Sequence, residues 1–448
     1  MSTERFMLRR QLETTFAVAI LLVISGCSEG DRQSGPDDKN AAFKVESVQE
    51  DQPAILNRIP WIGKGHWLKV DTHAHTTFSD GKFPIIAVVE SARNHGCDVI
   101  AITDHASHDL GAASEQYFAQ IRAAQKQFPE IEIIPGLEWN VPPYDGDEHV
   151  TVLTNPGNDA WLRQFKEDFD GYENTEVPPA LEALRWIDKT AGGKAVLLLN
   201  HPSRKRVDPK SIVVDMVHWQ SDSQSFIGFA GAPGHQNKAE VGSYLGKLTT
   251  IDRWDPATER IGGGWDQLLG SGHRIFAALA PSDFHSPAYG DYWPGEFSET
   301  WVYSPDRSAG GTLQALKAGS FFANHGGIAQ HVVLSVECQG LERPVQPGET
   351  LIAAGKPVDV LLEMQVPELD LQGNANSIDE IELIAIIDGN ASIIAKSTPK
   401  GTQTPLLQNF QVPSAGVVFR ARGRRVVTDG PDLMFYTNPV RVLASSKS

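Results

Sequence analysis

Two histidines stand one residue apart at the end of an apolar run early in the chain. The stretch from Val70 to Gly81 reads VDTHAHTTFSDG, and it holds His73, His75 and, five residues further on, Asp80. Because a β-strand alternates its side chains between two faces, His73 and His75 would project to the same side and could bind one metal ion. Asp80 is a third candidate ligand, from the loop that follows the strand.

The same residue types recur at the ends of other apolar runs. Parallel α/β barrels assemble their active sites at the C-terminal ends of their strands, so ligands on separate elements can converge at one mouth. All the candidates are imidazoles or carboxylates, which favours zinc, manganese or iron over an iron–sulfur centre. The nine candidates are His73, His75, Asp80, His105, Glu138, His149, His201, Asp283 and His285.

A scaffold of strands and crossover helices would position these residues. Between about residues 67 and 324, short β-branched runs alternate with amphipathic stretches, which is typical of parallel strands with helices between them. The expected helices are residues 84–95, 114–128, 178–191 and 264–270. The expected strands are residues 67–73, 98–105, 131–139, 149–154, 195–202, 225–231 and 274–285. Seven such strands predict a barrel.

The pattern changes near Ala329 to alternating strands with regular turn signals, which predicts a small antiparallel β-sandwich. At 448 residues the chain exceeds the usual size of one domain. We therefore predict an α/β barrel over residues 61–328 and an all-β, sandwich-like domain over residues 329–448. Cys97 and Cys338 are expected to be separate buried thiols, with an interdomain disulfide as the alternative.

The N-terminus has the pattern of an export signal. Arg5, Arg9 and Arg10 precede the apolar run FAVAILLVISGC, which is too short for a comfortable membrane span. Its end, ISGC, looks like the lipobox of bacterial lipoproteins. We expect a lipoprotein signal peptide over residues 1–27, lipidation at Cys27, a polar tether over residues 28–60, and attachment to a bacterial membrane on its periplasmic or cell-surface face. A plain cleaved signal peptide or an uncleaved anchor is the alternative.

Composition narrows the possible partners. The chain is 41% hydrophobic and 21% charged, with a formal net charge of −17. Such an acidic balance argues against general nucleic-acid binding, which normally uses a basic surface. It leaves metal-screened phosphate substrates open.

Taken in order, the motifs THAHTTFSDG, ITDH, IPGLE, EHVTVL, NHP and APSDFH strongly resemble those of the polymerase and histidinol phosphatase (PHP) superfamily. The resemblance covers about residues 67–330 and implies a distorted seven-stranded (βα)7 barrel with two to three divalent ions. Carried over by motif, it implies a first ion at His73, His75, Glu138 and Asp283, a second at Asp80, His105 and His285, and a third at His149, His201 and a bridging Glu138. The histidines that match no ligand position are His66, His95, His108, His218, His273, His325 and His331.

Hydrolysis by a metal-bridging hydroxide is the reaction that this resemblance implies. The superfamily favours phosphoester bonds, whereas the trailing β domain and the export signal resemble the carbaryl-hydrolase-type branch, which favours carboxyl or carbamate esters. We expect a metal-dependent phosphoesterase that acts on small-molecule phosphate mono- or diesters. The alternatives are a carbamate-ester hydrolase and a non-catalytic lipoprotein that binds metal or glycan, and the complete ligand set favours an enzyme.

Further residues near the candidate ligands in sequence could support them. Arg204, three residues after His201, could hold a phosphate or carboxylate through two hydrogen bonds, or it could belong to a solvated basic loop. Asp104 could orient a ligand imidazole or cap a loop. Residues 228–236 and 286–297 follow barrel strands and could line the mouth. The aromatic residues of the second segment could face the substrate or pack beneath the loop; they are Tyr289, Tyr292, Trp293 and Phe297.

Overall fold

The computed structural model describes residues 52–144, 146–174, 176–204, 209–232, 234, 252–399 and 401–445. They belong to one compact unit, Val48–Ser448. The predicted signal peptide, the lipidation site at Cys27 and residues 28–51 of the predicted tether lie outside the described residues, as does His235. Within the described ranges, no helix has the length and apolar character that a membrane span needs.

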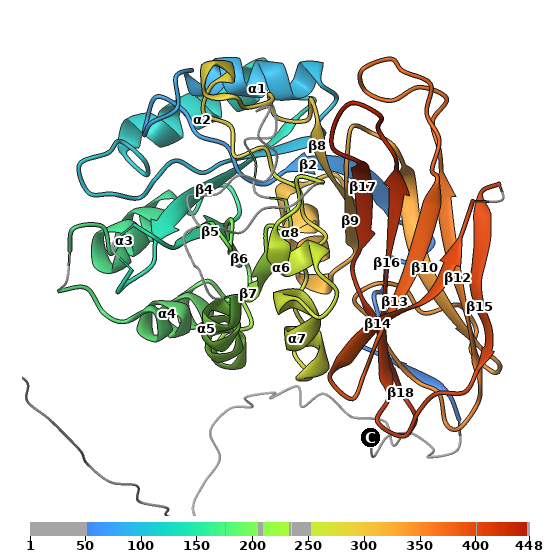
Figure 1. Ribbon diagram of the computed structural model, residues 1–448. Coiled ribbons are helices and arrows are strands. Elements are labelled where there is room, and N and C mark those ends of the chain that lie inside the picture. The colour runs from blue at the N-terminus through green and yellow to red at the C-terminus, as the bar shows by residue number, and fades with distance from the viewer. Residues whose placement is uncertain are drawn as a thin grey trace, which may run out of the picture. The chain divides into compact units, whose positions relative to one another are not determined.

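Six regular strands form the sheet of the N-terminal part, and helices cover it (Figure 1). In sheet order the strands are β2 (His66–Asp71), β3 (Val99–Ile102), β4 (Glu132–Asn140), β5 (His149–Leu153), β6 (Val196–Leu199) and β7 (Phe226–Phe229). Each lies within one residue of its predicted range. The connecting helices are α1 (Ile85–Asn94), α2 (Glu115–Gln127), α3 (Asp159–Phe169), α4 (Ala180–Thr190) and α5 (Pro209–Asp222), of which the sequence analysis missed α3 and α5.

Local sequence explains where the helices begin and which face they bury. The Ser114 side chain accepts a hydrogen bond from the Tyr117 backbone N–H at the start of α2, which is a standard N-cap. Helix α4 buries Ala183, Leu184 and Ile187, which share one side of the helix at spacings of one, three and four residues. These buried faces belong to the same apolar core as the strands beneath them.

The sheet departs from the predicted parallel order at β5, which is antiparallel to both β4 and β6. Residues 141–148 join β4 to β5, and a connection this short makes a hairpin, whereas parallel neighbours need a crossover of about a dozen residues or more. The pairs β2–β3, β3–β4 and β6–β7 are parallel, as predicted.

The seventh predicted strand, residues 274–285, is not a regular strand, so a regular seven-stranded barrel is not confirmed. Single bridges join Phe276 to Gly228 of β7 and Phe284 to Ala74, just after β2. The segment therefore lies between β7 and the chain that follows β2. Strand β8 (Ser298–Ser304) pairs with β2 from His66 to Val70 and so occupies the edge that a continuous ladder between the segment and β2 would need.

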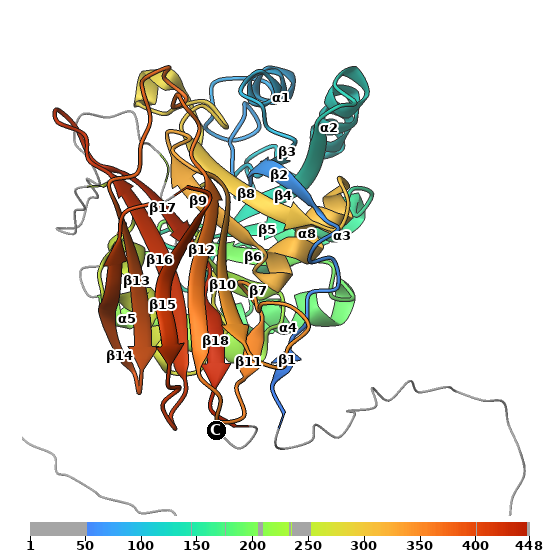
Figure 2. The same cartoon turned by 90° about the vertical axis from the view of Figure 1, so that its right-hand side faces the viewer.

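The C-terminal part is rich in β-structure, as predicted. One sheet contains β10 (Gln330–Cys338), β12 (Val358–Gln365) and β15 (Gln403–Phe410). The facing strands are β11 (Thr350–Ile352), β13 (Glu380–Ile387), β14 (Asn390–Ser397), β16 (Val417–Arg425), β17 (Leu433–Thr437) and β18 (Val440–Leu443). Figure 2 shows the two layers, whose inner side chains share one apolar core that includes Leu334, Leu362, Leu383 and Phe419.

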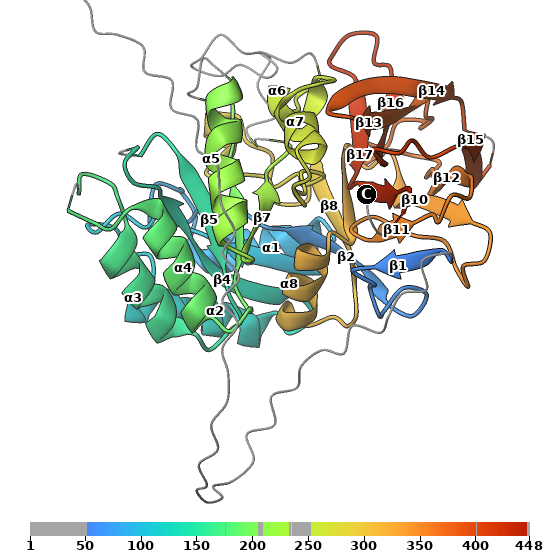
Figure 3. The same ribbon diagram turned by 90° about the horizontal axis from the view of Figure 1, so that it is seen from below.

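The two parts share a sheet. Strand β17 pairs with β9 (Phe321–His325), β9 pairs with β8, and β8 pairs with β2, so hydrogen bonding continues from the C-terminal strands into the N-terminal part. Helix α7 (Gly264–Gly270) packs against β13 and β14 (Figure 3). The short α6 (Pro256–Glu259) precedes α7, and α8 (Ala309–Ala318) lies between β8 and β9. A domain boundary at residue 328 stays a prediction.

The structure also bears on the predicted state of the two cysteines and on the predicted tether. Cys97 and Cys338 are both buried and free, as expected. The end of the predicted tether is part of the fold, because β1 (Ala54–Leu56) pairs antiparallel with β11 and Ile55 packs against the C-terminal core. The three residues of β1, Ala-Ile-Leu, are apolar, unlike most residues of the predicted tether, which explains why they pair with a sheet.

Candidate metal centre

The structure brings the nine candidate ligands together at one end of the N-terminal sheet. The parallel strands β2, β3 and β6 are followed there by His73 and His75, by His105, and by His201. His149 opens β5 and is paired with Asn140 at the end of β4. Because β5 runs antiparallel, its first residue lies at the same end as the last residues of its neighbours, which explains a candidate ligand at the start of a strand.

Glu138 lies at the middle of this cluster. Its Oε1 atom is 3.0 Å from Nδ1 of His149, 3.4 Å from Nε2 of His73 and 3.7 Å from Nε2 of His201. Its Oε2 atom is 2.8 Å from Nδ1 of His105 and 3.3 Å from Nε2 of His75. Burial would raise the pKa of Glu138, but the charges of His149, His105 and His73 outweigh it and hold the pKa well below its usual range.

Two more carboxylates flank the imidazoles. Oδ1 of Asp283 is 3.1 Å from Nε2 of His73 and 3.4 Å from Nε2 of His75. Oδ2 of Asp80 is 3.3 Å from Nε2 of His285 and 3.6 Å from Nε2 of His105. The Asp80 side chain is about half exposed, at 52%, whereas Asp283 is buried. Asp80 therefore stands at the open side of the cluster, where a substrate would enter.

The loop that carries Asp80 is held in place by Asp104. This fully buried carboxylate accepts hydrogen bonds from the Thr76 backbone N–H at 2.8 Å, the Thr76 hydroxyl at 2.8 Å and the Ser79 hydroxyl at 2.7 Å. Of the two roles considered from the sequence, these contacts are those of a residue that fixes a loop. Asp104 thus positions Asp80 through the backbone of residues 76–79.

The backbone is strained at two candidate ligands. His201 has φ +30° and Asp283 has φ +48°, a region that residues other than glycine rarely adopt. Such conformations cost on the order of 1–3 kcal/mol each and cluster at functional sites. The Asp283 backbone N–H donates to the His73 carbonyl at 3.1 Å, and the Arg204 N–H donates to the His201 carbonyl at 2.9 Å. The surrounding chain therefore fixes both side chains in unusual orientations.

Hydrogen bonds at the far side of two rings determine which nitrogen faces the cluster. Nδ1 of His73 lies 2.8 Å from the Thr103 hydroxyl and 3.1 Å from the Thr151 hydroxyl. Nδ1 of His285 lies 2.8 Å from the Asp283 carbonyl oxygen, to which it donates. With a proton on each Nδ1, the Nε2 lone pairs of both rings point toward the carboxylates. The sequence analysis missed Thr103 and Thr151, although Thr103 lies within the ITDH motif.

The pKa shifts show opposing charges packed into a buried space. Burial alone would lower the pKa values of His73 and His105, but Glu138 and the other carboxylates raise them to about 10 and about 11. Burial and the nearby His285 lower the pKa of His75 to about 3. Burial, with the charge of Arg204, lowers that of His201 to about 3 as well. Positive charge is thus favoured around Glu138, as a cation site requires.

The donor set fits divalent metal ions. Three groups of ligand atoms lie within 4.8 Å of one another: His75, Asp80, His105 and His285; His73, His75 and Glu138; and His105, Glu138 and His149. The buried Nδ1 atoms of His105 and His149 lie 2.8 and 3.0 Å from the Glu138 carboxylate. Without a proton, each of these atoms would offer a lone pair to a cation.

This grouping differs in part from the one that the family resemblance implies. His75 belongs to two of the groups, and His105 lies with Glu138 and His149 as well as with Asp80 and His285. Asp283 and His201 fall outside the three groups, although both contact the same imidazole and carboxylate cluster.

Arg204 lies at the edge of the cluster. Its NH1 atom is 3.4 Å from Nε2 of His201, and its side chain is partly exposed. Arg204 therefore lies next to a candidate ligand, and its predicted role in holding a phosphate or carboxylate stays a prediction.

The aromatic residues of segment 286–297 mostly pack beneath the loop. Trp293 stacks on Phe284 with ring centroids 4.3 Å apart, and Tyr292 stacks on Phe297 at 4.6 Å. Tyr289 is 44% exposed. Of the two alternatives from the sequence, packing describes Tyr292, Trp293 and Phe297, whereas the Tyr289 ring is exposed.

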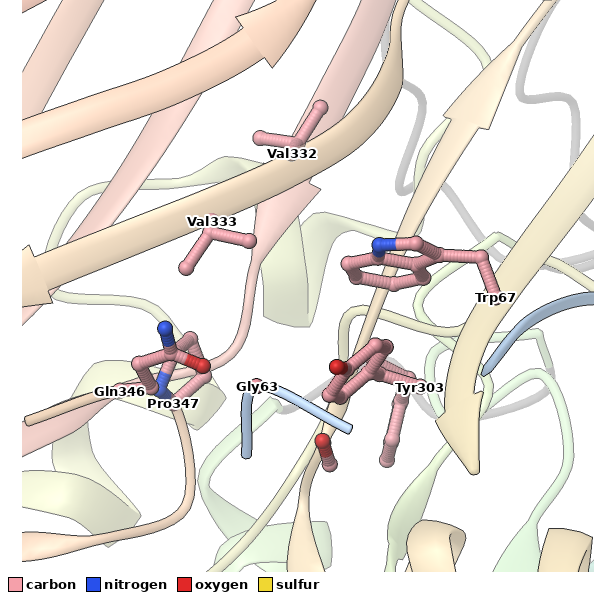
Figure 4. Close-up of a pocket in the computed structure, with 9 residues that line it drawn as sticks. Gly63, Trp67, Tyr303, Val332, Val333, Gln346 and Pro347 are labelled. Atoms are coloured by element: carbon pink, nitrogen blue, oxygen red, sulfur yellow. The ribbon is translucent and has the colours of Figure 1, made fainter. Parts of the chain in front are cut away.

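A separate pocket of about 180 Å³ lies beside Trp67 and Tyr303, across from Val332, Val333 and Pro347 (Figure 4). It contains none of the nine candidate ligands and no charged side chain. The pocket is therefore distinct from the metal-binding candidates.

Comparison with known proteins agrees with the motif resemblance. Residues 71–190 match the family model of the PHP domain. This match supports a relationship of the chain to the PHP superfamily. The PHP-like segment includes six of the candidate ligands, His73, His75, Asp80, His105, Glu138 and His149, whereas His201, Asp283 and His285 lie beyond it.

Similar proteins carry related descriptions. A probable phosphatase from Caldicellulosiruptor saccharolyticus is 32% identical over 152 residues, which cover 33% of this chain and 61% of that protein. A probable phosphatase from Vibrio vulnificus is 29% identical over 111 residues, 25% of this chain and 45% of that protein. The chain thus spans about half the length of the curated relatives that it matches.

A solved structure from Bacteroides vulgatus also aligns with the chain. It is described as a two-domain protein containing a predicted PHP-like metal-dependent phosphoesterase, and it is 16% identical. The alignment covers 85% of this chain and 95% of the other, with a TM-score of 0.41.

Proposed function

We propose that this protein is a metal-dependent phosphoesterase that hydrolyses small-molecule phosphate esters. The observation that carries the proposal is the surrounding of Glu138, whose carboxylate lies 2.8–3.7 Å from five imidazoles at one end of the sheet. The PHP match of residues 71–190 and the relatives named as probable phosphatases support it.

The nine clustered side chains would hold two to three divalent ions, with zinc, manganese or iron suited to their imidazole and carboxylate atoms. When bound, such ions lower the pKa of a water molecule toward neutrality and offset the negative charge of a phosphoryl group. Glu138 and Asp283 supply the negative charge that keeps cations together. Thr103 orients His73, and Asp104 fixes the loop that presents Asp80.

Arg204 gives the site a preference for an anionic group. Its planar guanidinium can donate two parallel hydrogen bonds to oxygens of a phosphate, and it stays charged at all physiological pH values. Placed 3.4 Å from His201, it would orient a phosphoryl group against the metal ligands. This contact supports a phosphate ester over a neutral ester as the substrate.

The C-terminal β-rich region favours a second candidate, a carboxyl or carbamate ester hydrolase of the carbaryl-hydrolase type. The same ligand cluster suits attack at a carbonyl carbon. A non-catalytic metal- or glycan-binding protein is the third candidate, and the retention of all nine clustered side chains argues against it.

Hydrolysis of matched p-nitrophenyl substrates separates these candidates. The purified protein, supplied with manganese or zinc, would be assayed with p-nitrophenyl phosphate, bis(p-nitrophenyl) phosphate, p-nitrophenyl acetate and a p-nitrophenyl carbamate. We expect metal-dependent release from the phosphates and loss of that release in the double variant His73→Ala, His75→Ala. The matched control is His218→Ala, whose imidazole is exposed on α5. Release of p-nitrophenol from the acetate and carbamate alone would favour the carboxyl or carbamate ester hydrolase. No release from any substrate would favour the non-catalytic binding protein.

We also propose that the chain is exported and attached to a bacterial membrane by lipid on Cys27. Support comes from the sequence ISGC after an apolar run with preceding arginines. Replacement of Cys27 by Ser should abolish incorporation of radiolabelled palmitate and release the protein from the membrane fraction. Unchanged labelling of the variant would disprove lipidation at this residue.

A further inference from the structure

A second pocket, of about 180 Å³, lies between the start of segment 274–285 and the C-terminal strands. Arg274 lines it from that segment, Arg441 from β18, and His273 from the turn after α7. Leu269, Phe276 and Val418 give it apolar walls. The candidate ligands Asp283 and His285 are at the other end of segment 274–285, so this pocket is separate from the candidate metal centre.

Arg274 has only backbone carbonyl groups as partners among the described residues. Its guanidinium donates to the carbonyl oxygens of Lys317 at 3.1 Å, Ala318 at 2.8 Å and Gly348 at 3.1 Å. One face of the guanidinium lies over the Phe276 ring, 4.9 Å from its centroid. These dipoles fix the cation in place, but no carboxylate in the described part of the chain forms an ion pair with it.

Arg441 is held in the same manner. Its NH2 atom donates to the carbonyl oxygens of Leu269 at 2.9 Å and His273 at 3.3 Å. Its Nε and NH1 atoms have no hydrogen-bond acceptor among the described residues. Burial lowers the pKa values of both arginines, that of Arg274 to about 10, which shows that each cation lacks a compensating charge.

One carboxylate does line the pocket, but it is already paired. Glu349 accepts two hydrogen bonds from Arg343, at 2.7 and 2.6 Å, and another from the Ile59 backbone N–H at 2.8 Å. Its charge is therefore balanced by Arg343. The net charge of the pocket is positive. Arg441 is partly exposed, so the donors that remain on it are open to solvent and can reach a bound anion.

We propose that this pocket binds a small organic oxyanion, with a phosphate or carboxylate group hydrogen-bonded by Arg441 and attracted by the charge of Arg274, and with an apolar body against Leu269, Phe276 and Val418. A bare inorganic ion would leave the apolar walls of the pocket uncovered, whereas a compact hydrophobic group would contact them. The ligand would contact both α7 and β18, because the carbonyl of Leu269 and the Arg441 side chain already meet there. This inference is independent of the proposed phosphoesterase activity.

Isothermal titration with three probes of similar size tests the proposal. Phenyl phosphate and benzoate carry the two candidate anionic groups, and benzyl alcohol is the neutral control. We expect saturable binding of at least one anion, at least tenfold weaker in Arg441→Gln and less strongly weakened in Arg441→Lys. The matched control Arg424→Gln changes an arginine of β16 that does not line this pocket, and it should bind as the wild type does.

The two anions also show which anionic group the pocket prefers. Tighter binding of phenyl phosphate would indicate a phosphate ligand, and tighter binding of benzoate a carboxylate ligand. The proposal is overturned if neither anion binds, if benzyl alcohol binds as tightly, or if Arg441→Gln binds the anions with wild-type affinity. Melting curves show whether each variant is folded, and Arg441→Lys keeps the test decisive if Arg441→Gln is not. The candidate metal centre is unchanged in all these variants, so any anion that binds there contributes equally to each titration. A difference in affinity between the variants therefore reports binding in this pocket.

Discussion

The guanidinium of Arg420 in β16 binds both carboxylate oxygens of Asp266 in α7. The distances are 2.6 Å from Nε to Oδ1 and 2.9 Å from NH2 to Oδ2, and both side chains are fully buried. The guanidinium also lies over the Trp265 ring, 4.9 Å from its centroid. A buried ion pair between residues 154 positions apart thus joins a helix of the N-terminal part to the C-terminal sheet.

Removing one member of this pair should strongly destabilise the protein. Arg420→Met leaves the Asp266 carboxylate buried without its partner, and such single replacements cost about 3–5 kcal/mol. The double variant Arg420→Met, Asp266→Leu removes both charges and should recover part of that loss. Urea unfolding gives the free energies.

The matched control is Arg424→Met, four residues further along β16. Its side chain is 42% exposed and pairs with Glu380, so its loss should cost about 1 kcal/mol or less. Equal effects of Arg420→Met and Arg424→Met would contradict a special role for the buried pair.

The motifs predicted the candidate site better than they predicted the scaffold. The nine residues follow or open short apolar runs, and a run that ends in His or Asp marks the end of a strand whatever the partner strand is. His149 shows this independence, because β5 has the opposite direction to the predicted one and yet brings His149 next to Asn140 at the same end of the sheet.

The sequence pattern did not predict the contacts between residues that lie far apart in the chain. Residues 274–285 have the apolar run of a strand, but they form only single bridges, one to β7 and one to Ala74 after β2, whose edge is paired with β8. Thr103 supports His73 from a neighbouring strand, and Arg420 meets Asp266 across 154 positions. Such contacts depend on which elements become neighbours, and local periodicity contains no information on that.

Asp104 is expected to control metal affinity through the loop that it holds. The Asp104 carboxylate accepts hydrogen bonds from N–H and O–H groups of Thr76 and Ser79. In Asp104→Asn one carboxylate oxygen becomes an NH2 group, which cannot accept these hydrogen bonds. The loop would shift Asp80, and the loss of such supporting groups weakens metal binding about 10–100-fold. Titration of zinc or manganese against a chromophoric chelator measures the change.

Asp159→Asn on α3 is the matched control, because it removes a carboxylate that pairs with Arg122 at the surface. Circular dichroism should show the wild-type spectrum for both variants. Wild-type metal affinity in Asp104→Asn would show that the Asp80 loop keeps its place without this carboxylate.

Asp252 should make stability depend on pH. Burial, reinforced by the negative charge of Glu259, raises the pKa of Asp252 from 3.8 to about 7. Between about pH 4 and 7 the folded state therefore keeps a proton that the unfolded state has lost, so the free energy of unfolding falls as the pH rises. Asp252→Asn removes this penalty and should be more stable than the wild type at pH 8 by on the order of 2–4 kcal/mol.

Below about pH 4 the two proteins should have similar stability, because Asp252 is then protonated in both the folded and the unfolded state. Urea unfolding at a series of pH values between 4 and 8 gives the difference curve. The exposed Asp429 provides the control Asp429→Asn, which should follow the wild-type profile. A pH-independent difference between Asp252→Asn and the wild type would contradict the raised pKa.

Arg204 provides the sharpest test of the substrate class. Its guanidinium lies 3.4 Å from Nε2 of His201 and has the geometry to bind two phosphate oxygens. In Arg204→Ala, kcat/KM for p-nitrophenyl phosphate should fall by about 10–100-fold, equivalent to the roughly 1.5–3 kcal/mol of a hydrogen bond to a charged group. Hydrolysis of a neutral p-nitrophenyl ester, where detectable, should change much less. Arg204→Lys keeps the charge without the planar fork and should recover part of the loss. Equal losses on phosphate and neutral esters would assign Arg204 to the support of His201 and remove its role in phosphate recognition.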